Sequence, residues 1–148
     1  MRIQLLLLAG LLLAAGCAGG DDQWTKDRRQ VVEAGGVVTF EGAPLPGATV
    51  IFSPAGGLSA AVGRTDAEGR FVLQTYEDGD GAIATDHNVT VTCVKVEGPP
   101  PGANLDEIDP TVKETSLIPE RYGHVDNSGL TATVTYDGPN EFKFELTK

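Results

Sequence analysis

Imidazole and thiol side chains are the groups best suited to chemistry near neutral pH, and this chain has few of them. It contains two histidines, His87 and His124, and two cysteines, Cys17 and Cys93. A histidine can act as a base beside an acid, but no serine or cysteine here stands in a nucleophile-elbow pattern, and no H-E-x-x-H motif occurs. Two cysteines and two histidines also match no closed zinc site of known spacing. We therefore predict a protein that is not an enzyme, with no catalytic residue, no metal site and no cofactor.

Acidic side chains could bind a cation instead. The stretch Asp78-Gly79-Asp80-Gly81 matches part of a calcium loop, but the twelfth position counted from Asp78 is Val89, where an EF-hand needs glutamate. We interpret this stretch as a plain glycine-rich turn. Asp66 and Glu68 could hold a cation weakly, but a role in a turn is sufficient to explain Asp66.

Length and charge exclude further classes of protein. The chain has 148 residues, which suits one domain, and 41% of them are hydrophobic, enough for a packed core. Asp and Glu number 21 against 11 for Lys and Arg, giving a net charge of −10. Such a surface repels a phosphate backbone, so we expect no nucleic-acid partner.

The first residues have the features of an export signal. An uncharged apolar run covers residues 5–15, and a membrane-spanning helix needs about 20 such residues, so the run fits a secretory signal better. Its ending, Leu13-Ala14-Ala15-Gly16-Cys17, resembles a bacterial lipobox. That resemblance implies removal of residues 1–16, a diacylglyceryl thioether on Cys17, an acyl chain such as palmitate on its amine, and a place on a membrane of the cell envelope. The alternative is an ordinary cleaved signal with Cys17 incidental.

Residues 17–35 are expected to form the lipidated cysteine and a flexible tether, because they are small and polar and then charged. A flexible tether of this length averages about 23 Å from end to end. Trp24 lies within it, and we expect its ring to rest on the lipid interface or on the domain.

Residues 36–148 are expected to form one all-β domain. Apolar and polar residues alternate with a period of two, and glycine- or proline-containing turns separate the runs. We expect about seven strands, near residues 38–41, 48–53, 60–65, 70–76, 89–97, 130–136 and 142–147. One apolar face per strand predicts a Greek-key β-sandwich, without a helix of more than two turns.

The strand expected at 89–97 changes phase. Val89, Val91 and Cys93 share one face, whereas Val94 and Val96 lie on the other. A β-bulge near Cys93 or burial on both faces would explain this. We expect Cys93 to be a buried thiol without a disulfide partner.

Three motifs carry a family resemblance. The stretches Gly36 to Gly42, Pro44 to Phe52 and Thr65 to Phe71 resemble a carboxypeptidase regulatory-like domain. That family implies a transthyretin-like (prealbumin-like) sandwich that is mostly a non-catalytic accessory. The chain is also similar to small bacterial lipoproteins that share the stretch Ile118 to Tyr122 and the ending Asn140 to Leu146.

Two further expectations concern individual residues. The core should contain large apolar residues from several strands, namely Phe40, Val50, Phe52, Phe71, Phe142 and Phe144. A transthyretin-like hydrolase that opens 5-hydroxyisourate ends in Tyr-Arg-Gly-Ser, and this chain ends in Phe144-Glu145-Leu146-Thr147-Lys148. We therefore do not expect that activity.

These observations predict a lipid-anchored, non-catalytic envelope module with a structural or protein-interaction role. It is expected to be a monomer that meets the membrane through Cys17 and binds an envelope protein or glycan. The alternative is a carbohydrate-binding module, for which Tyr76 and Tyr122 would be the remaining exposed aromatic platform. The long stretch Gly98 to Gly129 is the expected functional surface, with Ile118, Pro119 and Tyr122 pinning it to the edge of the sandwich.

Overall fold

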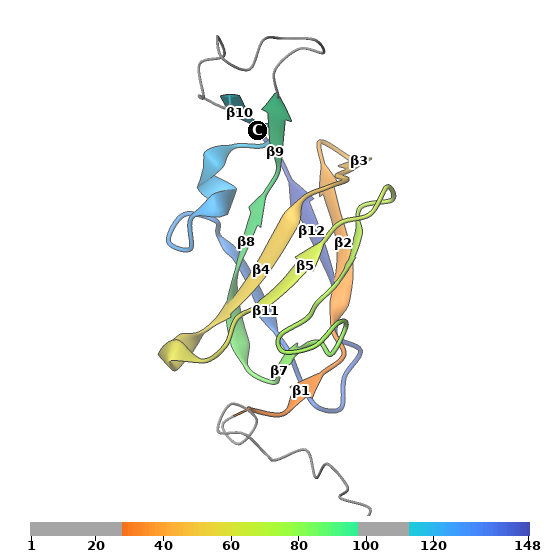
Figure 1. The fold of residues 1–148 in the computed structure, drawn as a ribbon, viewed down its shortest axis with the longest axis vertical. Helices are drawn as coiled ribbons and strands as arrows, with labels where there is room; N and C mark the ends of the chain where they lie inside the picture. The colour runs from red at the N-terminus through yellow and green to blue at the C-terminus, as the bar shows by residue number, and fades with distance from the viewer. Residues whose placement is uncertain (1–27, 98–112) are drawn as a thin grey trace, which may run out of the picture.

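The computed structural model describes residues 28–97 and 113–148, and these residues form an all-β sandwich (Figure 1). Their helical elements are two short 3-10 turns, η1 (Ala55–Gly57) and η2 (Glu120–Gly123). None of the helices in these two ranges has the length and apolar character needed to cross a membrane. The expected signal peptide, Cys17 and Trp24 lie outside the described residues.

Two four-stranded sheets pack face to face. The first is antiparallel throughout and has the order β11 (Leu130–Thr133), β8 (Asp86–Thr92), β4 (Thr49–Pro54) and β5 (Ala61–Arg64). The second contains β12 (Glu141–Leu146), β2 (Gly35–Phe40) and β3 (Ala43–Pro44), with β6 (Arg70–Val72) also pairing with β2. The pairing of β12 with β2 is parallel, which joins the last strand of the chain to the start of the domain. The expected all-β sandwich is confirmed.

Aromatic rings fill the space between the sheets. The Phe52 ring is fully buried, and its centroid lies 5.3 Å from that of Phe142, 6.0 Å from that of Phe144 and 6.2 Å from that of Phe71. Such tilted and edge-on pairs are favourable beyond the area they bury. The expected core is confirmed, although Phe40 and Phe142 are only partly buried against it.

Strand pairing begins earlier in the chain than residue 36. Val31–Val32 forms β1, which pairs antiparallel with β7 (Ala82–Ile83), and Ala34 is 5% exposed. Residues assigned to the tether from their composition therefore belong to the sandwich. Two adjacent valines have a strong β preference, and β7 offers them an edge to pair with.

The strand expected at 89–97 is interrupted at Cys93. Beyond it, β9 (Val94–Glu97) pairs with β10 (Lys113–Ser116) as a separate two-stranded ribbon. Val94 and Val96 are 51% and 56% exposed, so the phase change does not reflect burial on both faces. It marks the point where the strand leaves the sandwich and rises beyond it (Figure 1).

The long stretch 98–129, which we expect to be the functional surface, contains β10 and η2 in its described part. Leu117 continues the β10 pairing by donating its N–H to the carbonyl oxygen of Cys93 at 2.8 Å, and β11 resumes opposite Val89. Thus β11 and β10 pair with the same side of the consecutive strands β8 and β9. Residues 118–129 form an excursion between β10 and β11. Ile118 and Tyr122 are 5% and 6% exposed, which confirms that they pin this excursion to the sandwich.

Candidate functional site

The acidic turn after β6 is held by one carboxylate. Asp80 accepts main-chain N–H bonds from Thr75 at 2.6 Å, from Tyr76 at 3.0 Å and from Glu77 at 3.1 Å. Its oxygens therefore accept main-chain N–H groups, and this stretch forms a turn, as expected. Among residues 28–97 and 113–148, no three His, Cys, Asp or Glu side chains lie close enough together to hold a metal.

The second acidic candidate is also part of a turn. Oδ1 of Asp66 accepts the N–H of Glu68 at 3.0 Å and that of Arg70 at 2.8 Å. The neighbouring Thr65 hydroxyl is buried, donates to the carbonyl oxygen of Leu45 at 2.6 Å and accepts the N–H of Ala48 at 2.8 Å. Thr65 and Asp66 therefore fix the connections between strands, and both side chains are committed to that task.

The two histidines lie in different environments. His87, in β8, is 3% exposed, its Nε2 lies 2.8 Å from the carbonyl oxygen of Ile83, and its ring packs 5.6 Å from that of Phe52. Because a carbonyl oxygen can only accept, Nε2 carries the proton of this contact, and Nδ1 is a buried acceptor without a hydrogen-bond partner. His124 is exposed at the end of η2, where its main-chain N–H donates to Arg121. Both are consistent with structural roles.

Cys93 is a free, buried thiol, as expected. It is 4% exposed, and its sulfur lies 3.7 Å from the carbonyl oxygen of Pro46. Burial raises the pKa of the Cys93 thiol, and the positive charge of Arg64 partly opposes this shift. A raised pKa leaves little reactive thiolate at neutral pH.

The aromatic platform expected for a sugar is not formed as predicted. Tyr122 is 6% exposed, and the Arg121 guanidinium lies over its ring at 4.6 Å from the centroid. Tyr76 is half-buried, and the guanidinium of Arg28 lies 5.2 Å from its ring centroid. The prediction of an exposed Tyr122 face is therefore wrong, because that side chain serves to anchor the excursion.

Arg121 and Tyr122 together bind the C-terminal end of the chain. Arg121 donates to the carbonyl oxygens of Thr147 at 2.7 Å and Lys148 at 3.1 Å. Burial is the largest influence on the pKa of Tyr122 and would raise it, but the hydrogen bonds with Thr147 and Arg121 and the Arg121 charge together lower it. The sequence marked this stretch as a motif without indicating that it contacts the chain terminus.

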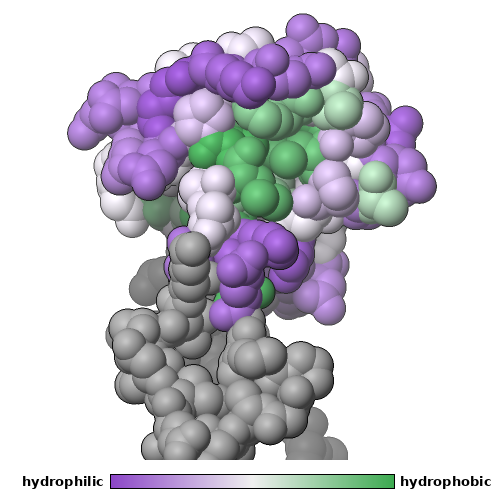
Figure 2. All heavy atoms as spheres, turned by 90° about the horizontal axis from the view of Figure 1, so that it is seen from above, coloured by the Kyte–Doolittle hydropathy of each residue, from purple (hydrophilic) through white to green (hydrophobic). Residues whose placement is uncertain are grey.

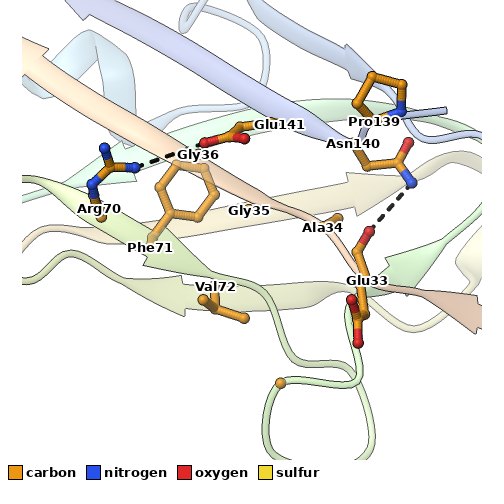
Figure 3. A pocket seen from close by; sticks show the side chains of 11 residues that line it. Glu33, Ala34, Gly35, Gly36, Arg70, Phe71, Val72, Pro139, Asn140 and Glu141 are labelled. Atoms are coloured by element: carbon orange, nitrogen blue, oxygen red, sulfur yellow. Dashed lines mark hydrogen bonds and ion pairs between the residues drawn. The ribbon is translucent and has the colours of Figure 1, made fainter.

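An open groove of about 540 Å³ runs along the start of β2 (Figure 3). Asn140 closes one end, donating to the carbonyl oxygens of Glu33 at 3.3 Å and Thr135 at 2.9 Å. At the other end Arg70 lies 3.8 Å from Glu141, and both side chains are largely exposed. The groove presents charges of both signs, of which Arg70 and Glu141 pair with each other, and Glu33 also lines it. Sequence reasoning did not identify this groove.

The upper end of the sandwich carries exposed hydrophobic residues. Val94 and Val96 of β9 and Leu117, just after β10, are 49–56% exposed. Figure 2, which looks down on this end, shows hydrophobic side chains gathered between hydrophilic ones. Exposed apolar surface rimmed by polar residues is typical of interaction sites, so this end is the candidate functional surface.

Comparisons with known proteins add little to this description. No family model matches the chain, and no curated protein matches it. Among solved structures, a 9R-lipoxygenase from Cyanothece PCC8801 matches with 16% sequence identity and a TM-score of 0.37. The match covers 80% of this chain but 16% of the lipoxygenase chain, and the likeness is too low to support an inference about function.

Proposed function

We propose that this protein is a lipid-anchored, non-catalytic module of the cell envelope that acts as a protein-interaction domain. The observation that carries the proposal is that the chain enters the sandwich at one end and the exposed valines lie at the other. The chain enters the domain at the end bearing β1 and β7, whereas β9, β10 and the C-terminus lie at the opposite end (Figure 1). A lipid on Cys17 would therefore leave the exposed valines of β9 facing away from the membrane.

The functional groups of the domain support a non-catalytic role. Asp66 and Asp80 hold turns, and Arg121 and Tyr122 hold the C-terminal end of the chain. Asp66, in a stretch that resembles carboxypeptidase regulatory-like domains, and Tyr122, in a stretch similar to small lipoproteins, thus have structural explanations in this chain. A chain built in this way offers surfaces rather than a reaction centre.

The anchor is tested by changing Cys17 to serine and following the protein in a bacterial cell. Wild-type chain is expected in the membrane fraction, with a mature N-terminus at Cys17 whose mass includes the acyl chains. Cys17→Ser is expected to remain unprocessed or to become soluble, with the sandwich still folded. Cys93→Ser is the matched control and should keep the lipid. A wild-type mature chain without acylation, starting at another residue, would refute the anchor.

The interaction role is tested by crosslinking the intact protein in its native envelope and identifying captured proteins by mass spectrometry. Val94→Lys together with Val96→Lys should abolish capture of the proteins bound by wild type. Val72→Lys is the matched control, because Val72 is 64% exposed but lies on β6 beside the groove. Equal loss of capture in both variants would argue against the upper end as the binding surface.

A further inference from the structure

Strand β9 has one partner and one open edge. It pairs with β10 over Val94 to Glu97, and all four of its residues are exposed. On the other side, the pairing of β8 with β4 ends where Thr92 faces Thr49. Within residues 28–97 and 113–148, no strand pairs with that second edge of β9. An open strand edge is a template for pairing with another chain.

The hydrogen bonding of the ribbon fixes which residues face the open edge. Leu117 donates its N–H to the carbonyl oxygen of Cys93, so the main chain of Cys93 points toward the β10 side. Main-chain direction alternates along an antiparallel strand. Lys95 and Glu97 therefore point toward β10, and the main-chain groups of Val94 and Val96 point toward the open edge.

The charges along β9 are complementary to those of a second, antiparallel copy of the same strand. Lys95 and Glu97 share one face, and their charged groups lie 3.2 Å apart in an exposed ion pair. When two copies of such a strand pair antiparallel about Val96, each Lys95 stands opposite the Glu97 of the other copy. Opposite charges directly across a strand pair are stabilising, and like charges are destabilising.

In place of the monomer expected from the sequence, we propose that the open edge of β9 pairs antiparallel with β9 of a second copy of this chain, with Val96 facing its own counterpart. Residues whose main-chain groups point toward the open edge must lie opposite such residues of the other copy. Three registers meet this condition: Val94 opposite Val94, Val94 opposite Val96, and Val96 opposite Val96. Centring on Val94 would place Lys95 opposite the buried Cys93 and Val96 opposite Thr92, whose edge β4 already occupies. Pairing Val94 with Val96 would place the two Lys95 side chains opposite each other. The Val96-centred register gives two complementary charge pairs.

A disulfide at the proposed centre tests the register in the full chain. Residues that exchange two main-chain hydrogen bonds have Cα atoms about 5.5 Å apart, within the range that a disulfide spans. Val96→Cys should therefore form a covalent dimer under mild oxidation. Val94→Cys is the matched control on the same strand, because its counterpart would lie about 13 Å away, too far for a disulfide. Wild-type chain, treated in the same way, sets the background from Cys17 and Cys93.

The charge pairs are tested in the Val96→Cys background. Adding Lys95→Glu should lower the yield of covalent dimer about tenfold, because two complementary pairs become two repulsive ones. Adding Lys95→Arg should preserve the yield. Unchanged far-UV circular dichroism shows that each variant is folded.

The proposal is overturned if Val94→Cys crosslinks as readily as Val96→Cys, if neither forms a dimer, or if Lys95→Glu has no effect. Crosslinks from Val96→Cys to other proteins alone would likewise overturn it, because they would assign the edge to a foreign strand. The experiment does not depend on lipidation, so its outcome is separate from the fate of the proposed membrane anchor.

Discussion

Tyr122 and Thr147 exchange two hydrogen bonds across the sandwich. The Thr147 N–H donates to the phenol oxygen at 3.0 Å, and the phenol donates to the Thr147 carbonyl oxygen at 3.2 Å. Tyr122 lies in η2, whose excursion belongs to the β11–β8 side, whereas Thr147 directly follows β12 of the other sheet. One side chain therefore fastens the excursion and the C-terminal end of the chain to each other.

Removing the hydroxyl group of Tyr122 should lower the stability of the domain without opening a cavity. Tyr122→Phe keeps the buried ring but loses both hydrogen bonds to Thr147, so we expect a loss of about 1–2 kcal/mol in the free energy of unfolding. Urea denaturation measures it. Tyr136→Phe is the control, because Tyr136 is 59% exposed and its change should stay within about 0.5 kcal/mol. Equal stability of Tyr122→Phe and wild type would show that water replaces these bonds without loss.

The turn after β6 should depend on Asp80 and not on Asp78. Asp80→Ala leaves three main-chain N–H groups without their acceptor, and we expect a loss of about 2 kcal/mol in the free energy of unfolding. Asp78→Ala removes an exposed carboxylate and should change it by less than about 0.5 kcal/mol. Thermal unfolding with and without added calcium checks both variants. A calcium-dependent rise in the wild-type midpoint that either variant abolishes would contradict the turn interpretation.

Gly36 should tolerate no side chain. A Cβ there would collide with the carbonyl oxygen of Phe142 on the neighbouring β12, so Gly36→Ala should separate the parallel pair and lower the free energy of unfolding by about 3 kcal/mol. Gly129→Ala is a useful comparison, because its Cβ would meet nothing within 4 Å but its φ is +64°. That variant should lose about 1 kcal/mol through backbone strain alone. Chemical denaturation of both separates crowding from strain.

The reactivity of Cys93 should report its burial. Because burial raises the pKa of the Cys93 thiol above its ordinary value of 9.0, the folded state holds its proton more tightly than the unfolded state does. The associated stability is therefore fully present below about pH 9 and decreases as pH rises through the folded pKa. Alkylation of Cys17→Ser chain, followed from pH 7 to 10, should be slow when folded and fast in urea.

Arg64 supplies the control for that measurement. Its positive charge opposes the effect of burial on Cys93, so Arg64→Gln should raise the pKa of the thiol further and slow alkylation of the folded protein. Alkylation at the same rate in folded and unfolded chain would contradict the burial of Cys93.

Local pattern determined much of this protein from the sequence alone. Alternation at Val50 and Phe52, or at Phe142, Phe144 and Leu146, predicts strands with one buried face, because side chains of a strand point alternately to its two faces. Turn residues such as Asp66 and Gly69 mark where strands end, because their conformations are local. The all-β class, most strand positions and most of the core follow from these short-range signals.

Tertiary structure decided which strands meet, because pairing depends on residues far apart in the chain. The parallel alignment of β12 with β2 and the pairing of Val31–Val32 with β7 have no local signature. The burial of Tyr122 depends on Thr147, a residue that only folding brings near. The open edge of β9 exists because β4 begins at Thr49 and its pairing with β8 does not extend beyond Thr92. The phase change at Cys93 marked this place in the sequence but did not show that a strand edge is left open there. Sequence thus determined which residues turn inward, and long-range packing determined which surfaces remain free to bind.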